Sequence, residues 1–310
     1  MSRILITGVT GQDGSYLAEL LVAADHEVHG TSLSADEHSV DGVELHQLDL
    51  SQPGIGGLIR SLAPDVVYNL AAISSVYGSW QKHELTARIN GLAVSEMLAA
   101  LQGVLGARFV QASSAEIFGA PVEVPQTERT PIKPTSPYGA AKAYAHSLVN
   151  VYRTAGVWAS SCILYNHESP RRPETFVTRK ITASAVRISL GLQGTLELGN
   201  LDARRDWGWA PDYVDALYRV AQSNTPGDYV IATGIDHSVQ DFVAEAFARV
   251  GISDWRAYVT VSDEFIRSGD APRQVGDASY AREKLGWAPT VGFEEIVANM
   301  VDHDLELLRA

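Results

Sequence analysis

The segment that most constrains the fold is a β-prone run, RILIT, that leads directly into the glycine-rich stretch GVTGQDGSYLAELLVAA. The glycines have the spacing GxxGxxG and stand where a helical pattern of apolar residues begins. Glycine permits a tight turn and lets the backbone approach a pyrophosphate, which a helix N-terminus attracts. We therefore predict a dinucleotide-binding strand–turn–helix unit, the alternative being a tight turn without a ligand. The candidate cofactor contacts here are Gly8, Gly11, Gln12, Asp13 and Gly14.

Strand and helix patterns alternate through the first half of the chain. The strand-like segments are RILIT, EVHGTS, DVVYNLAA, RFVQASS and SSCILYN, and the clearest helices are GSYLAELLVAA and TARINGLAVSEMLAAL. This alternation predicts the α/β class, with a Rossmann-type doubly wound parallel sheet. After Asn166 the pattern is less regular, which favours a smaller C-terminal substrate-binding domain. We expect residues 1–166, with parts of 207–237 returning to them, to bind the dinucleotide, and residues 167–310 mainly to bind the substrate.

Composition and charge exclude several classes of function. The 310 residues carry a formal net charge of −13, which argues against nucleic-acid or anionic-membrane binding, because both need distributed positive charge. The sequence has no apolar run of about 18 residues and no signal-peptide pattern, so we expect a cytoplasmic protein without a membrane partner. Cys162 is the only cysteine and is expected to be a buried thiol rather than a nucleophile.

A local cluster of cations interrupts this acidic chain. It consists of Arg171, Arg172, Arg179 and Lys180. A compact anionic ligand needs only a few cations, so the cluster is compatible with a phosphate-bearing substrate, and the alternative is a set of structural ion pairs. The preceding pair of histidine and glutamate, HE, has no matching second ligand, so no metal site is predicted.

Tyr138 and Lys142 are predicted to share one face of a helix, because SPYGAAK places them four residues apart. A tyrosine with its ordinary pKa of about 10 is a poor base, and we expect the neighbouring ammonium to lower that pKa. Lys142 is also predicted to hydrogen-bond the cofactor ribose, and Ser114 to polarise a substrate hydroxyl or carbonyl. YxxxK alone is common by chance, but with the glycine segment it predicts hydride transfer at a carbinol carbon.

Glu116 narrows the predicted chemistry. It lies two residues beyond Ser114 in the same segment, ASSAEIFG. Simple alcohol oxidation needs one proton acceptor, which Tyr138 would supply. A second base suggests a further proton transfer, such as abstraction α to a transient ketone. The alternative is a solvent-exposed loop carboxylate.

The choice between NADP and NAD depends on the end of the second predicted strand. An acid there would bind the ribose 2′-hydroxyl of NAD, whereas GTSLSADEH offers Ser32 and Ser34 and no acid until Asp36. We therefore predict NADP, with NAD as the alternative. Asp49 is placed either to contact adenine or to cap its own loop. The remaining candidate cofactor contacts are Ser32, Asp49, Leu50, Leu70, Tyr138 and Lys142.

Over almost its whole length the chain resembles the GDP-mannose 4,6-dehydratases, within the extended short-chain dehydrogenases/reductases. The resemblance is carried by ITGVTGQDGSYLAELL, VVYNLAA, QASSAEIFG, SPYGAAKAYA, NHESPRRPETFVTRKI, LGNLDARRDWGWAPDYV, YVIATGIDHSV and KLGWAP. The fifth and sixth of these motifs separate the family from epimerases and ketosugar reductases. The resemblance implies a hydro-lyase that acts on a GDP-sugar and recycles a tightly bound nicotinamide cofactor.

The resemblance also implies roles for the catalytic residues. Tyr138 would take the proton of the sugar C4 hydroxyl as hydride leaves C4 for the nicotinamide. Glu116 would then take the C5 proton and assist loss of the C6 hydroxyl as water, and hydride would return to C6. The product would be a GDP-4-keto-6-deoxy sugar. Ser114 stands where the family has threonine, which preserves the hydroxyl.

The substrate contacts are likewise implied by the resemblance. Arg205 and Arg267 would bind the diphosphate, and Asp270 would bind the ribose. Val177 and the backbone near Leu198 and Gly199 would line the base pocket. The other residues implied around the nucleotide sugar are Asn166 and Lys180.

Two departures from the family pattern affect the expected assembly and cofactor. Leu33 and Ser34 occupy positions where the family usually has paired arginines, and the loop that follows is shorter. That loop helps family members to form tetramers, so we expect a homodimer and leave a tetramer open. Two alternatives to a dehydratase remain: a nucleotide-sugar epimerase or 4-ketosugar reductase, and a non-catalytic nucleotide- or redox-sensing module.

Overall fold

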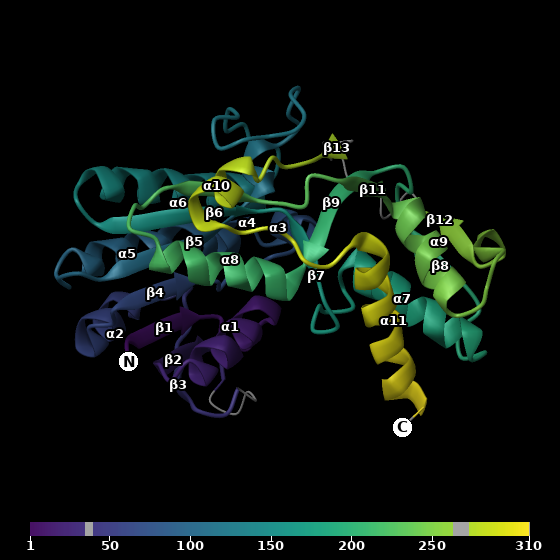
Figure 1. Cartoon of the computed structure of the whole chain (residues 1–310), viewed down its shortest axis with the longest axis horizontal. Coiled ribbons are helices and arrows are strands. Elements are labelled where there is room, and N and C mark those ends of the chain that lie inside the picture. Colours follow the sequence, from purple (N-terminus) through teal and green to yellow (C-terminus); the bar gives the residue numbers. More distant parts are fainter. Residues whose placement is uncertain (35–39, 263–272, 310) are drawn as a thin grey trace.

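A seven-stranded parallel sheet forms the larger part of the molecule (Figure 1). The computed structural model describes residues 1–34, 40–262 and 273–309. The strand order is β10-β6-β5-β4-β1-β2-β3, so the chain winds outward from β1, then returns to β4 on its other side. That reversal is the topological switch point at which doubly wound sheets bind ligands. The strands are β1 Arg3–Thr7, β2 Glu27–Ser32, β3 Val43–Gln47, β4 Val66–Asn69, β5 Arg108–Ser114, β6 Trp158–Leu164 and β10 Asp228–Ile231.

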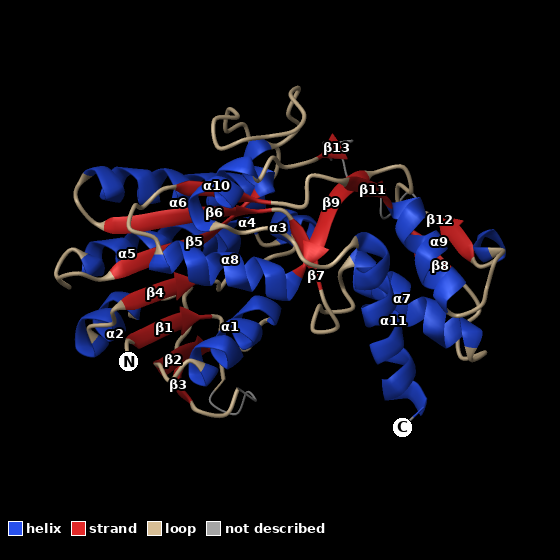
Figure 2. Cartoon of the chain, viewed as in Figure 1, coloured by secondary structure: helices blue, strands red, loops and turns tan. Residues whose placement is uncertain are grey.

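Helices cover both faces of this sheet (Figure 2). Side chains alternate along a strand, so Ile4 and Ile6 of β1 join a core with α1 and α8, whereas Leu5 joins a core with α2 and α5. The predicted α/β class and doubly wound parallel sheet are confirmed. The helices are α1 Gln12–Ala23, α2 Ile55–Leu62, α3 Val76–Gln81, α4 His83–Ala87, α5 Ala93–Leu101, α6 Pro137–Thr154, α8 Ala210–Gln222 and α10 Ser279–Leu285.

The segment TARINGLAVSEMLAAL departs from the single long helix that its pattern predicts. A π-helical turn, Arg88–Leu92, separates α4 from α5. Within it, Asn90 is buried and its side chain bonds both the N–H and the carbonyl of Ile73. This bonding ties the loop after β4 to the turn, and such turns often mark functional sites.

A second hydrophobic core lies in the C-terminal part of the chain. Trp207 is buried there against Phe242 and Phe293, so it packs between elements rather than offering a surface for a base. A small sheet of β11, β9 and β13, with β7 paired to β9, stands between this core and the large sheet (Figure 1). The elements are β7 Asn166–Glu168, α7 Val177–Ser189, β8 Leu196–Leu198, β9 Arg204–Trp209, β11 Asp236–Ser238, α9 Val239–Arg249, β12 Val259–Val261, β13 Arg273–Gln274 and α11 Phe293–Arg309.

The chain crosses between the two cores several times. After β9, helix α8 and strand β10 join the large sheet, where β10 pairs with β6. Ala281 of α10 and Trp287 also lie in the core of that sheet, although the sequence placed them in the substrate-binding part. Cys162 is fully buried, as the sequence predicts. In the part of the chain that is described, no helix has both the length and the apolar character needed to cross a bilayer.

Candidate active site

The glycine segment forms a cradle at the N-terminus of α1. Gly8 has φ +69°, and a Cβ at Gly14 would lie 2.2 Å from the Gly8 carbonyl oxygen, so larger residues cannot fit this backbone. Gly11 is the N-cap of α1, and no described side chain caps the helix there. The N–H groups of a first turn without a cap attract a phosphate. The cradle therefore fits the pyrophosphate of a dinucleotide, as the sequence predicts.

Gln12 and Asp13 tie this cradle to strand β7. Asp13 Oδ2 lies 2.9 Å from His167 Nε2, and His167 Nδ1–H donates to the Tyr165 carbonyl at 2.7 Å. Burial opposes both charges, but their mutual attraction prevails, raising the pKa of His167 and lowering the pKa of Asp13. Gln12 Nε2 donates to the His167 carbonyl at 3.2 Å. The predicted cofactor residues thus also join the two parts of the molecule.

The predicted catalytic residues Ser114 and Tyr138 come together at the carboxyl end of β5. Ser136 caps α6 by accepting the Gly139 N–H, and Pro137 follows at the first helical position, so the local sequence starts the helix here. Tyr138 lies in the first turn, is 8% exposed, and hydrogen-bonds Ser114. Ser114 ends β5, and its hydroxyl oxygen accepts the Glu116 N–H at 3.3 Å.

Lys142 lies one turn beyond Tyr138, but it does not lower the tyrosine pKa as the sequence predicts. Burial raises the pKa of Tyr138 to about 12, against a lowering effect of the Ser114 hydrogen bond. Burial lowers the pKa of Lys142 to about 8. Its Nζ donates to the Ala112 carbonyl at 2.8 Å and lies 5.9 Å from the centre of the Tyr138 ring. The expected lowering of the Tyr138 pKa is therefore wrong here, because burial of the phenol prevails and the amine is directed at a backbone carbonyl.

Glu116 has a neighbour that the sequence did not indicate. It is half-buried in the 3₁₀ turn Ala115–Phe118, and its charge raises the pKa of Tyr138. Gln274 Nε2 lies 3.4 Å from Glu116 Oε1 and 3.4 Å from the Gly119 carbonyl oxygen. The Gln274 Oε1 atom is buried without a hydrogen bond to any described residue. Gln274 lies in the two-residue strand β13, which is too short for a recognisable pattern.

The cluster of arginines separates into structural and site-facing members. Arg171 binds Glu19 at 2.6 Å and covers the Tyr16 ring, and Arg179 forms a buried ion pair with Asp304. These two arginines are thus structural, which was one of the two sequence-based interpretations.

Arg172 packs over the Phe176 ring, and its charge acts on the catalytic residues. Its Nε is 3.4 Å from Glu168 Oε2 and makes no hydrogen bond within the described residues. Its charge lowers the pKa of both Tyr138 and Asp13. Sequence reasoning left this residue undecided, because only the fold brings the charge of Arg172 close enough to act on Tyr138.

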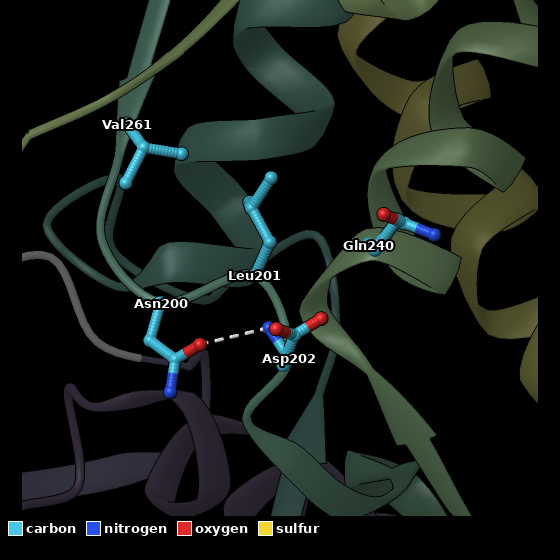
Figure 3. A pocket seen from close by; sticks show the side chains of 5 residues that line it. All are labelled: Asn200, Leu201, Asp202, Gln240 and Val261. Carbon is cyan, nitrogen blue, oxygen red and sulfur yellow. Dashed lines mark hydrogen bonds between the residues drawn. The ribbon is translucent and has the colours of Figure 1, made fainter.

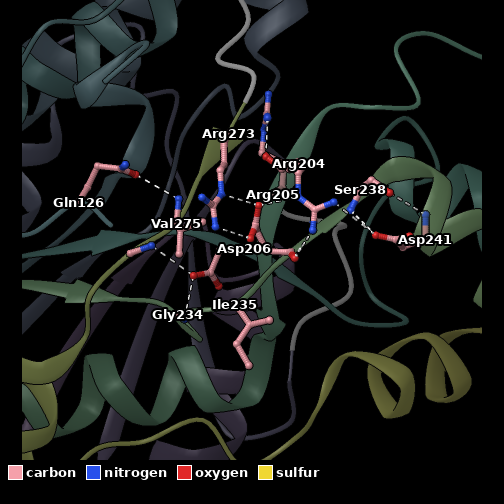
Figure 4. Close-up of polar contacts among 12 residues, drawn as sticks. Gln126, Arg204, Arg205, Asp206, Gly234, Ile235, Ser238, Asp241, Arg273 and Val275 are labelled. Atoms are coloured by element: carbon pink, nitrogen blue, oxygen red, sulfur yellow. Dashed lines mark hydrogen bonds and ion pairs between the residues drawn. The ribbon is translucent and has the colours of Figure 1, made fainter. Parts of the chain in front are cut away.

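The implied diphosphate ligand Arg205 lies in β9, 8% exposed, and donates to the Arg204 carbonyl at 2.8 Å (Figure 4). Its neighbours Arg204 and Arg273 both bind Asp236, at 2.7 and 2.8 Å. Those two guanidinium groups are therefore engaged in structural ion pairs. The other two predicted ligands from this region, Arg267 and Asp270, lie outside the described residues.

A hollow of about 420 Å³ lies beside the predicted base-binding segment (Figure 3). Leu198 is buried and pairs with Val261 across β8 and β12, and Gly199 follows it directly. The hollow is lined by Asn200, Leu201, Asp202, Gln240 and Val261. Asp202 is exposed at this hollow, and its N–H donates to Asn200 Oδ1 at 2.9 Å. The predicted base-binding backbone thus adjoins an open, partly polar recess.

The other implied substrate residues lie on the adjoining elements. Asn166 begins β7, and Val177 is the first residue of α7. Lys180, one turn further along α7, donates from Nζ to the Glu197 carbonyl at 2.7 Å. The three side chains are only partly buried, and they remain predictions as substrate contacts.

The remaining cofactor candidates follow strands of the large sheet. Asp49 is exposed, and its Oδ1 accepts the Ser51 N–H at 2.8 Å, which is the loop-capping arrangement. Ser32 ends β2 and donates to the Ser34 carbonyl, while Leu50 is buried and the Leu70 N–H donates to Thr7 Oγ1 at 3.2 Å. Most of these residues lie at the carboxyl ends of their strands, the edge at which such sheets bind ligands.

Comparison with known proteins places this geometry in context. The family model described as GDP-mannose 4,6 dehydratase matches residues 5–300. GDP-mannose 4,6 dehydratase 2 of Arabidopsis thaliana is 43% identical, with 98% of this chain and 87% of the relative covered. The GDP-mannose 4,6 dehydratase of Homo sapiens is 40% identical, with 98% and 92% covered.

Solved structures show the same fold. UDP-glucose 4-epimerase of Thermus thermophilus, in complex with NAD, has a TM-score of 0.85 at 27% identity, covering 97% of this chain and 98% of the epimerase. RMD of Pseudomonas aeruginosa, complexed with NADPH, has a TM-score of 0.82 at 21% identity, covering 99% and 100%. These neighbours bind different nicotinamide cofactors, so the likeness supports a nicotinamide cofactor without distinguishing NADP from NAD.

Proposed function

Because the chain belongs to the GDP-mannose 4,6-dehydratase family, we propose that it is a hydro-lyase that converts GDP-mannose into a GDP-4-keto-6-deoxy sugar. The observation that carries the proposal is the meeting of a phenol, a hydroxyl and a carboxylate, from Tyr138, Ser114 and Glu116. Oxidation alone needs one base, whereas oxidation followed by water elimination needs two.

The cofactor site fits a dinucleotide. The cradle of Gly8, Gly11 and Gly14 would hold the pyrophosphate, and Lys142 would hydrogen-bond the nicotinamide ribose. The bound nicotinamide would supply reversible hydride acceptance, taking hydride from C4 and returning it to C6. We propose NADP, because neither Ser32, which ends β2, nor Ser34 repels a 2′-phosphate, and the Ser32 hydroxyl could turn from the Ser34 carbonyl to donate to that phosphate. Measured affinities for NADP and NAD would decide between the two.

Tyr138 would take the proton from the sugar C4 hydroxyl, with Ser114 orienting that hydroxyl by a hydrogen bond. Because burial raises the pKa of Tyr138 to about 12, the phenolate needs nearby positive charge. Arg172 already lowers the pKa of this tyrosine, and Lys142 would add to the effect if its amine turned from the Ala112 carbonyl to a bound ligand.

Glu116 would take the proton from C5, which the C4 ketone acidifies. The same carboxylic acid would then protonate the departing C6 hydroxyl, so that one proton leaves C5 and one water leaves C6. Gln274, within 3.4 Å, would hold the carboxylate in place. This proton shuttle leaves Glu116 ionised again. Hydride return to C6 then leaves an enolate, which would regain a proton at C5 in exchange for the one that Tyr138 took from the C4 hydroxyl, so that both residues end each turnover in their starting forms.

The substrate would span the small sheet and the C-terminal core. Arg205 and Lys180, together with Arg267, would contact the anionic nucleotide diphosphate, since arginine forks suit phosphate. The guanine would enter the recess next to Leu198 and Gly199, where the exposed carboxylate of Asp202 matches the N–H donors of a guanine edge.

The test is Glu116→Gln in the full chain, incubated with GDP-mannose and followed by mass measurement of the nucleotide sugar. We expect the unaltered protein to produce a species lighter by one water, and the variant to bind cofactor and GDP-mannose normally with turnover reduced by about 10²–10⁴-fold. Full turnover by the variant would refute the role of Glu116. A product isomeric with the substrate would instead indicate an epimerase.

We also propose that the protein is a cytoplasmic homodimer. Large apolar side chains are exposed along α3, α4, the π-helical turn and α6, which contact one another. They are Tyr77, Trp80, Leu85, Leu92, Tyr144 and Val151. An extended apolar surface of this kind is typical of a protein–protein interface.

A further inference from the structure

A second group of chemically active side chains lies outside the proposed active site, on β2 and β3. The strands contain the matching sequences EVH (27–29) and ELH (44–46). Because side chains alternate along a strand, each sequence places its glutamate and its histidine on the same face. The parallel register aligns His29 with Glu44 and Thr31 with His46, so both pairs face the same side of the sheet. β3 is the edge strand.

Three of these side chains converge on one point. His29 Nδ1 lies 3.0 Å from His46 Nε2 and 3.7 Å from Glu44 Oε2, and His46 Nε2 lies 3.8 Å from Glu44 Oε1. With zinc–nitrogen bonds of about 2.0–2.1 Å, two ligand nitrogens at a tetrahedral angle are roughly 3.3 Å apart. The observed separations are close to these, so small side-chain movements would suffice to admit an ion.

Glu27 holds His29 in the tautomer that can bind a metal ion. Its Oε1 lies 3.0 Å from His29 Nε2 and also accepts from Arg3 Nε at 2.8 Å. A carboxylate in this position keeps the proton on Nε2, which leaves the Nδ1 lone pair directed at His46 and Glu44. Histidine ligands of metals usually have such a partner on the second ring nitrogen.

The cluster is accessible from solvent on one side, so an ion could enter it. The His29 side chain is 4% exposed, that of His46 is 23% exposed, and that of Glu44 is 69% exposed. The buried imidazole is thus held rigidly, while the carboxylate can close over an ion from the solvent side.

We propose that His29, Glu44 and His46 bind a Zn²⁺ ion that links the edge strand β3 to β2. Two imidazoles and one carboxylate suit a borderline metal such as zinc, whereas Mg²⁺ and Ca²⁺ prefer oxygen ligands. Water would complete the coordination. The site is structural, because none of its residues belongs to the proposed catalytic set. It departs from the sequence-based expectation of no metal, which considered only the histidine and glutamate of β7.

The experiment uses the full chain, stripped of metal with a chelator and dialysed. Zn²⁺ is titrated in competition with a chromophoric chelator, and Co²⁺ serves as a spectroscopic probe of tetrahedral coordination. We expect one ion per chain, a melting temperature that rises with Zn²⁺, and at least tenfold weaker binding in Glu44→Gln and His46→Gln with turnover unchanged. Because these two side chains lie on the edge strand, the variants should fold even if His29→Gln does not.

His83→Gln, on the exposed helix α4, is the matched control and should bind Zn²⁺ as the unaltered chain does. Glu27→Gln should weaken binding by a smaller factor, since it loses only the carboxylate that fixes the His29 tautomer. The proposal would be overturned if Glu44→Gln and His46→Gln bound Zn²⁺ with the same affinity as the unaltered chain. A melting temperature that does not respond to Zn²⁺ would also overturn it, and would leave the cluster as a hydrogen-bonded network only.

Discussion

At the scale of single residues, Gln274 offers a direct test of how the second base is held. Replacing it with Met keeps a similar volume but removes the amide that lies 3.4 Å from Glu116. A hydrogen bond to an ionised carboxylate favours its charged form, so its loss should raise the pKa of Glu116. We expect Gln274→Met to lower kcat by about tenfold and to move the acidic limb of the kcat–pH profile to higher pH, because such bonds contribute about 1.5–3 kcal/mol.

A KM unchanged within a factor of two would show that substrate binding is intact in this variant. Gln193→Met, on the exposed stretch after α7, is the matched control and should leave the pH profile unchanged. A uniform loss of activity at every pH would assign Gln274 to packing and not to the positioning of Glu116.

The ion pair of Asp13 and His167 makes a prediction about stability and pH. The raised pKa of His167 gives stability that is fully present below its ordinary value of about 6.5 and is lost as pH rises through the folded-state value. The lowered pKa of Asp13 gives stability that is present above about 3.8 and is lost as pH falls through the folded-state value. Asp13→Asn should therefore destabilise the protein most between about pH 4 and 6.5, by about 3–5 kcal/mol.

Denaturant unfolding of both proteins across pH 4–9 measures this difference. The difference in unfolding free energy between the unaltered protein and Asp13→Asn should become smaller above the raised pKa of His167, because the imidazole is then neutral in both proteins. If that free-energy difference stayed constant over the whole pH range, the charge of Asp13 would not be what joins the cradle to β7.

At the scale of elements, the cradle depends on its closest backbone contact. A Cβ at Gly14 would lie 2.2 Å from the Gly8 carbonyl oxygen and 2.7 Å from the Val9 Cα atom, so Gly14→Ala must shift the backbone. We expect it to lower stability by about 1–3 kcal/mol and to weaken cofactor binding measured by calorimetry. Gly57→Ala in α2 is the control, because nothing lies within 4 Å of its Cβ and it should gain about 0.5–1 kcal/mol. Equal cofactor affinity in the two variants would contradict the assignment of the cradle.

The sequence predicts elements well where the determining signal is local. The spacing from Tyr138 to Lys142, the serine and proline that begin α6, and the glycines before α1 are all features of a few adjacent residues. Gln274 and Arg172 escaped prediction because their neighbours are brought by the fold from more than 30 residues away. The expected lowering of the Tyr138 pKa failed for a related reason: the periodicity of a helix does not reveal burial or the carbonyl that engages Lys142.

At the scale of the whole molecule, the apolar side chains along α3, α4 and α6 predict association. Tyr144 of α6 lies against the π-helical turn, 3.1 Å from the position of a Cβ at Gly91, and Leu92 beside it is 55% exposed. Leu92→Glu should shift the protein from dimer to monomer in sedimentation velocity. Leu307→Glu, at a 60% exposed apolar residue of α11, should leave the dimer intact. A monomeric unaltered protein would refute the interface.

The repeated crossings of the chain between its two cores have a consequence for how such a protein can be built. A segment ending at Asn166 would lack α8 and β10, and with them the outermost strand of the sheet and much of one covering layer. The part that recognises the nucleotide sugar therefore cannot be transplanted as a cassette onto another cofactor-binding scaffold. New specificity in this architecture has to arise by altering side chains in place, with both halves inherited together.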